Sequence, residues 1–186
     1  ALLQYITDLL VNSLEIAKWR VEYFGDKASA STLLNGFDGW FAQAAAVPGL
    51  VVPIAKNNGA TFALQQMTGQ EIYELLLAME ALYLEQEWAG DKPMEYRMTK
   101  KMAMTLAAYM NKLKDSACCD GVERLNPDNL ATKFFYFDKL AFHGIPIKPM
   151  PEWDKIINKV TPLNGGGGNA ARVDPNRVLL INKTNL

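Results

Sequence analysis

The longest regular pattern of apolar and polar positions lies at the start of the chain, between Leu2 and Phe24. Apolar side chains recur there every three or four residues, which places them on one face of an α-helix. They are Leu3, Ile6, Leu10, Leu14, Ala17, Val21 and Phe24. No Gly or Pro interrupts this run, and Gly25 is a typical residue for a helix end. The pattern predicts one continuous helix, ~35 Å long at ~1.5 Å per residue, that packs only partly on its own subunit.

Three further helices are predicted from capping signals and apolar spacing. Asn35 can cap a short helix that contains Phe37, Trp40, Phe41 and Ala44 and that stops at Pro48-Gly49. Thr68 and the glutamate three residues later form a capping box, after which apolar residues again follow a helical period. Thr99 can cap a third long helix over residues 100–114.

Strand-like runs alternate with these helices. Met94 to Met98 is short and alternating, and Phe134 to Phe137 is strongly β-prone. The prolines between Gly144 and Pro151 predict an edge strand, because proline cannot donate to a neighbouring strand. Trp153 to Val160 fits a short helix or a strand, and Arg177 to Ile181 fits a final strand. This order predicts an α+β chain, in which a mixed α/β body follows the long helix.

Composition and charge narrow the class of protein. The chain has 186 residues, of which 49% are hydrophobic and 21% charged, so it can form one sizeable domain or a domain with a projecting part. A net charge of -1 argues against broad electrostatic binding of nucleic acid. No apolar run reaches the ~20 residues of a membrane helix, and no secretory signal is visible. Because the chain begins at the edge of a helix and stops after a strand-like run, we expect a piece of a longer polypeptide.

Few residues have the pattern of an active site. His143 is the only histidine, so a metal cluster of histidines is excluded and a catalytic triad would depend on it alone; we expect a structural or surface role. Glu80, Glu85, Glu87 and Asp91 lack the histidines of a di-metal site and are interpreted as a solvated face. The adjacent Cys118 and Cys119 are poorly placed for a disulfide and are interpreted as free thiols in a reducing compartment. We therefore expect no catalytic residue, no metal site and no cofactor.

The glycine-rich run from Asn164 to Asn169 is not a phosphate-binding loop, because a P-loop needs a Lys followed by Ser or Thr. It is interpreted as a flexible loop, since ordering each residue costs ~1–2 kcal/mol of backbone entropy. Seven aromatic residues could suggest base stacking, but no basic residues are interleaved with them and they are interpreted as core: Trp40, Phe41, Trp88, Phe134, Phe135, Tyr136 and Phe137. Six methionines are interpreted as core filler: Met79, Met94, Met98, Met102, Met104 and Met110.

Four motifs in order resemble a known family. The long helix ends in Tyr23-Phe24-Gly25-Asp26, and Met94 to Thr99 leads into a capped helix. Ala141 to Ile147 contains a hydrophobic-x-Gly-hydrophobic-Pro-hydrophobic pattern, and Arg177 to Leu186 is an apolar strand with a small polar end. Together they resemble the major capsid protein of tailed bacteriophages, which has the Hong Kong 97 fold.

This resemblance implies a shell-building protein without catalysis. Residues 1–26 would be the spine helix of the peripheral domain, and residues 27–186 the axial domain at the centre of each capsomer. The chain would contact copies of itself in pentamers and hexamers, with packaged DNA only weakly contacted and no membrane or small-molecule substrate. It would be made in the bacterial host cytoplasm and reside in the virion capsid. The expected inter-subunit contact residues are Asn164, Gly165, Gly166, Gly167, Gly168 and Asn169.

Two alternatives stay open at this point. An encapsulin-type nanocompartment shell shares the fold but packs protein cargo. A small soluble α/β enzyme with an unrecognised site belongs to a different class, and the absence of paired catalytic groups counts against it.

Overall fold

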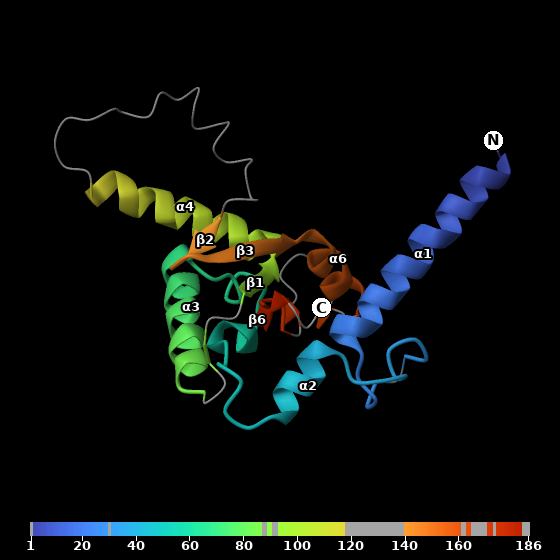
Figure 1. Cartoon of the computed structure of the whole chain (residues 1–186), viewed down its shortest axis with the longest axis horizontal. Coiled ribbons are helices and arrows are strands. Elements are labelled where there is room, and N and C mark those ends of the chain that lie inside the picture. Colours follow the sequence, from blue (N-terminus) through green and yellow to red (C-terminus); the bar gives the residue numbers. More distant parts are fainter. Residues whose placement is uncertain are drawn as a thin grey trace. The chain divides into compact units, whose positions relative to one another are not determined.

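The computed structural model describes residues 2–29, 31–86, 89–90, 93–117, 140–160, 163–164, 171–172 and 174–183. Within these residues it contains five α-helices and a four-stranded mixed sheet (Figure 1). This confirms the α+β class. The chain forms two compact units, residues 1–51 and residues 52–186, which are described separately. The expected assignment of residues 1–26 and 27–186 to two capsid domains stays a prediction.

The first unit is built on helix α1, which runs unbroken from Leu2 to Phe24 as the sequence predicts. Only its last two residues, Tyr23 and Phe24, are buried among those described in the helix. Phe24 packs on Phe41 of helix α2 (Trp40–Ala46), with ring centroids 5.2 Å apart. Packing within this unit is therefore concentrated at the C-terminal end of α1.

The turn after α1 depends on two glycines. The Gly25 amide donates to the Val21 carbonyl at 2.9 Å, and the Gly39 amide donates to the Gly25 carbonyl at 2.9 Å. A Cβ on Gly25 would overlap the carbonyl oxygens of Phe37 and Val21. The two backbones can approach this closely only because neither residue has a side chain.

The prediction that Asn35 caps the second helix is wrong. Helix α2 begins at Trp40, and Gly39 is its N-cap residue. The Asn35 amide instead donates to the Ser31 carbonyl at 3.0 Å, and Asp38 accepts from the Lys27 amide at 2.9 Å. Residues 31–38 close a loop onto the end of α1, and this tertiary contact delays the helix start.

The second unit contains a four-stranded sheet in the order β2-β3-β1-β6. Its strands are β2 (Ala141–Phe142), β3 (Ile145–Met150), β1 (Met94–Thr99) and β6 (Val178–Asn182). Strand β1 pairs with β3 in parallel and with β6 in antiparallel orientation. Strands β4 (Leu163–Asn164) and β5 (Ala171–Arg172) form a separate antiparallel pair.

The prediction that residues 144–151 form an edge strand is wrong, because β3 lies between β2 and β1. Strand β2 is only two residues long and pairs with Ile145 and Pro146. Gly144, at φ +84°, makes the tight turn that returns the chain from β2. The proline-containing strand is accommodated at an internal position because its neighbour covers only its first residues.

Two helices cover one face of this sheet and enclose the core. They are α3 (Gly69–Leu84) and α4 (Lys100–Ala117), which pack together over β1 (Figure 1). The core side chains come from both helices and from three strands: Ile72, Leu75, Leu76, Tyr96, Met98, Met102, Ala103, Leu106, Phe142 and Ile147. The prediction that Met104 is core is wrong, because its position on α4 leaves it 52% exposed. At the α3–α4 crossing, a Cβ on Gly69 would overlap the Tyr109 side chain, so glycine sets how closely the helices approach.

The start of α4 confirms the predicted cap at Thr99, whose hydroxyl accepts the Met102 amide at 3.4 Å. The segment that fitted either a helix or a strand is helix α6 (Pro151–Val160), which buries Trp153. Asp154 in its first turn accepts the Lys100 amide at 2.9 Å and so links α6 to the start of α4.

Several sequence predictions fall outside the described residues. They concern Cys118 and Cys119, the Phe134–Phe137 run, Glu87, Trp88, Asp91 and residues 165–169. Among the helices that are described, none combines the length and apolar character that crossing a membrane requires.

Candidate functional site

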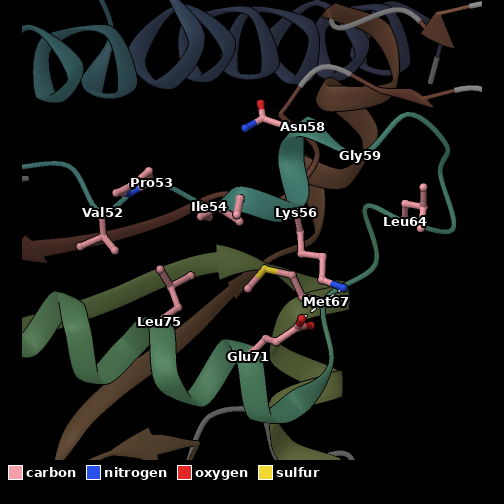
Figure 2. A pocket seen from close by; sticks show the side chains of 11 residues that line it. Val52, Pro53, Ile54, Lys56, Asn58, Gly59, Leu64, Met67, Glu71 and Leu75 are labelled. Carbon is pink, nitrogen blue, oxygen red and sulfur yellow. Dashed lines mark ion pairs between the residues drawn. The ribbon is translucent and has the colours of Figure 1, made fainter.

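An apolar pocket of about 550 Å³ lies in the second unit beside the N-terminal half of α3 (Figure 2). Its walls come from the extended segment 52–54, the short 3₁₀ helix η1 (Ala55–Asn58), the following loop and the first turns of α3. The lining residues are Val52, Pro53, Ile54, Ala55, Lys56, Asn58, Gly59, Leu64, Met67, Glu71 and Leu75. The volume falls in the usual range for small-ligand pockets, ~300–1,000 Å³.

The apolar lining is an extension of the core of the unit. Leu75 is a buried core residue on α3, and Val52, Ile54 and Met67 pack against the same core from outside. Figure 2 shows Val52, Ile54 and Met67 lining the space above Leu75. The pocket therefore opens where the segment before α3 covers the core incompletely.

Its main electrostatic feature is an ion pair between Lys56 of η1 and Glu71 of α3. The Lys56 Nζ lies 3.1 Å from Glu71 Oε1, and Figure 2 shows the two side chains reaching toward each other. The Lys56 side chain is 39% exposed and the Glu71 side chain 34%. Solvent therefore screens this pair, and its contribution to stability is small.

Glu71 also completes the capping box at the start of α3, which confirms the sequence prediction. Its Oε2 accepts the Thr68 amide at 2.7 Å, and the Thr68 hydroxyl accepts the Glu71 amide at 3.2 Å. The Thr68 amide holds the pKa of the Glu71 carboxyl below its usual value; partial desolvation opposes this shift and Lys56 adds to it. The carboxylate is thus ionised at neutral pH, and its Oε2 already accepts a hydrogen bond at the N-terminus of its own helix.

A cluster of amide side chains holds η1 in place behind the pocket. The Asn57 Nδ2 donates to the Asn176 carbonyl at 3.0 Å, and Asn57 Oδ1 accepts the Asn176 amide at 2.9 Å. Asn176 Nδ2 also donates to the carbonyl of Gln65, a residue that is only 1% exposed. These bonds tie η1 and the loop after it to the segment that enters β6.

The pocket lining is apolar apart from a few polar side chains. Its lining contains one carboxylate and one ammonium group, which pair with each other, and it contains no His, Cys or Ser. Across the described residues, no group of three His, Cys, Asp or Glu side chains is arranged to hold a metal ion. The pocket can accept an apolar side chain or a small apolar group, with Asn58 and the Lys56–Glu71 ion pair among its lining residues.

His143 lies at the β2–β3 turn, away from the pocket lining, and pairs with Glu80 of α3. Its Nδ1 is 2.7 Å from Glu80 Oε2, and its ring stacks on Phe142 with centroids 4.3 Å apart. The side chain is 48% exposed. The pair fastens the β2–β3 turn to α3, which fits the surface role expected for this histidine. Glu80 is therefore paired; Glu85 is the exposed C-cap residue of α3.

Sequence reasoning missed a buried charge cluster on the central strand. Glu95 and Arg97 of β1 are each only 8% exposed, and Arg97 Nε donates to Glu95 Oε1 at 2.9 Å. Lys183, just after β6, lies 3.4 Å from Glu95 Oε2. The available signal was the alternation of charged with apolar residues at 94–98, which puts Glu95 and Arg97 on the same face of β1.

The predicted inter-subunit loop is described only at its first residue. Asn164 lies in β4, where it pairs with Ala171 of β5. Gly165, Gly166, Gly167, Gly168 and Asn169 lie outside the described residues. Their role in contacts between subunits stays a prediction.

Comparisons with protein-family models, with curated proteins and with solved structures found no match for this chain.

Proposed function

We propose that this chain is a structural shell subunit of the Hong Kong 97 type, and specifically part of the major capsid protein of a tailed phage or prophage. The proposal rests on the ordered resemblance of four motifs in the sequence. The observation that carries it is the segment Ala141 to Ile147, in which a hydrophobic-x-Gly-hydrophobic-Pro-hydrophobic pattern forms a tight hairpin.

The local structure of two motifs supports this proposal. In the hairpin, Gly144 has a positive φ that an L side chain rarely adopts, so the glycine of the pattern meets a backbone requirement. At the end of α1, Gly25 makes the close approach to Gly39, and Asp26 accepts the Ala28 amide at 2.8 Å in the turn that follows. Each of these two motifs thus lies in a turn whose backbone shape depends on the glycine of the motif.

The arrangement of elements also supports a structural role. A long helix with mostly exposed apolar residues belongs to one unit, and a compact helix-covered sheet forms the other. Exposed apolar surface on this scale marks interaction sites more often than reaction centres. In this proposal the protein works by contacting copies of itself, encloses DNA with weak contacts, and needs no cofactor.

The test is to express the complete gene that encodes this chain, together with its neighbouring genes, and to image the particles by electron microscopy. We expect closed shells of pentamers and hexamers. A neighbouring portal, protease or scaffold gene favours the capsid, whereas a cargo gene and a protein-filled shell favour the encapsulin alternative. Failure to form any shell under these conditions, combined with substrate turnover, would support the enzyme alternative and overturn the proposal.

A further inference from the structure

Helix α1 carries a broad apolar face that its own unit leaves open. Nine large apolar side chains between Leu2 and Ile16 are exposed, and at ~100° per residue eight of them fall on about half of the helix circumference. These eight, called here the α1 face, are Leu2, Leu3, Tyr5, Ile6, Leu9, Leu10, Leu14 and Ile16, with relative exposures from 45% to 79%. Val11 is the exception and lies among the polar residues of the opposite side.

The hydroxyl groups on and beside the α1 face donate hydrogen bonds to backbone carbonyls of the same helix. The Ser13 hydroxyl donates to the Leu9 carbonyl at 2.8 Å, and the Thr7 hydroxyl donates to the Leu3 carbonyl at 2.9 Å. Asp8 is the only charged residue from Leu2 to Leu14, and it lies on the opposite side of the helix. The face can therefore be buried without leaving a charge or a hydroxyl unpaired.

The spacing of the face points to another helix as the group that covers it. Leu2, Leu9, Ile16 and Tyr23 follow one another at intervals of seven residues. Leu3, Leu10, Ala17 and Phe24 form a second series with the same interval. The two series are one residue apart, or ~100° around the helix. With Ile6 between them they form an apolar stripe of the width that packs against another helix.

The area of the face matches what one partner contributes to a stable interface. At the exposures given above, each side chain leaves on the order of 100 Å² in water, so the face amounts to roughly 800 Å². A standard protein interface buries about that much on each side. A second copy of α1 supplies the same area and the same apolar stripe, and a two-fold axis lets one patch serve both subunits.

We propose that α1 pairs with α1 of a second copy of this chain through the α1 face. The inference does not depend on the shell function, because an isolated dimer with no shell would satisfy it. The contact is helix against helix, centred between Ile6 and Leu10.

The test compares two substitutions at neighbouring positions of the whole chain. Leu10→Glu places a charge in the α1 face, whereas Val11→Glu places the same charge on the opposite side of the same helix turn. Both positions are exposed, at 60% and 47%, so neither change opens a cavity. Sedimentation velocity over roughly 1–100 µM measures the self-association constant of each protein. Far-UV circular dichroism of each variant reports whether α1 keeps its helix content.

We expect the unmodified chain and Val11→Glu to dimerise alike, and Leu10→Glu to weaken association by about tenfold or more. Leu3→Glu, at a position that is 79% exposed, provides a second variant in the face. A chain that stays monomeric throughout overturns the inference, and so does an equal effect of Leu10→Glu and Val11→Glu. Binding of the unmodified chain to lipid vesicles without self-association would also overturn it, in favour of a lipid partner. If the chain forms larger assemblies, unchanged assembly of both Leu3→Glu and Leu10→Glu is the contradicting result.

Discussion

Helices α1 and α3 share a helical period of apolar residues but differ in what covers those residues. In α3, which has 16 residues, Ile72, Leu75 and Leu76 are buried against β1 and α4. In α1, which has 23 residues, burial is limited to Tyr23 and Phe24 at one end. An apolar period thus defines the face that a helix would bury, whereas the surrounding chain decides whether that face is covered.

The two helices also differ in their local stabilisation. Helix α3 begins with a capping box and has an acidic residue, Glu71, in its first turn. Helix α1 has no acidic residue in its first turn and no basic residue in its last. Since helices in water depend mostly on tertiary packing, the N-terminal part of α1 needs contacts that the described residues of its own unit do not supply.

The largest effect is expected from truncating matched leucines in the two helices. Leu76→Ala removes a side chain that is 0% exposed and leaves a cavity, so we expect the free energy of unfolding to fall by ~2–5 kcal/mol. Leu14→Ala changes a residue that is 69% exposed, and we expect the free energy of unfolding of a single subunit to fall by less than ~0.5 kcal/mol. Urea denaturation followed by circular dichroism measures both values. Equal losses would contradict the difference in burial between the helices.

A smaller effect is expected from adding a methyl group where α3 crosses α4. Gly69→Ala places a Cβ against the Tyr109 side chain, so the helices must move apart, and we expect a loss of about 1–3 kcal/mol. Gly36→Ala is the control, because a Cβ there meets nothing within 4 Å. Denaturant midpoints of both variants, measured side by side, decide the question. A neutral Gly69→Ala would show that the crossing tolerates a wider separation.

The smallest effect concerns the pH dependence of the α3 cap. The pKa of Glu71 in the folded chain lies below its ordinary value of 4.5, chiefly because of the Thr68 amide. Its contribution to stability is therefore fully present above pH 4.5 and is lost as the pH falls through the lowered folded pKa. We expect Glu71→Gln to cost less than ~1 kcal/mol at pH 7, because glutamine can still complete the capping box and solvent screens the lost charge. The cost should decrease progressively below pH 4.5, in thermal or urea unfolding.

Lys56→Met tests which partner of Glu71 matters more. It removes the ion pair but keeps the Thr68 amide, so the pH dependence should persist in this variant. Disappearance of the pH dependence in Lys56→Met would show that the ion pair, and not the cap, lowers the pKa.

Local signals predicted much of the fold. The apolar period of α1, the capping box of α3 and the Thr99 cap of α4 are patterns within single elements or turns, and all are confirmed. The candidate pocket could not be predicted in this way, because its lining joins residues 52–59 to the first turns of α3 across the core. The amide contact between Asn57 and Asn176 joins residues 119 positions apart, and no local pattern indicates it.

The errors in prediction have the same origin. Asn35 has good capping chemistry, but the approach of Gly39 to Gly25 moved the start of α2 to Trp40. The prolines of β3 suggested an edge, but a strand of two residues fits beside them and makes β3 internal. The sequence by itself determined where helices can begin, end and present an apolar face, because those properties arise within a few residues. The tertiary structure decided which faces are covered, which strands are neighbours and where the pocket opens, because these depend on contacts between distant segments.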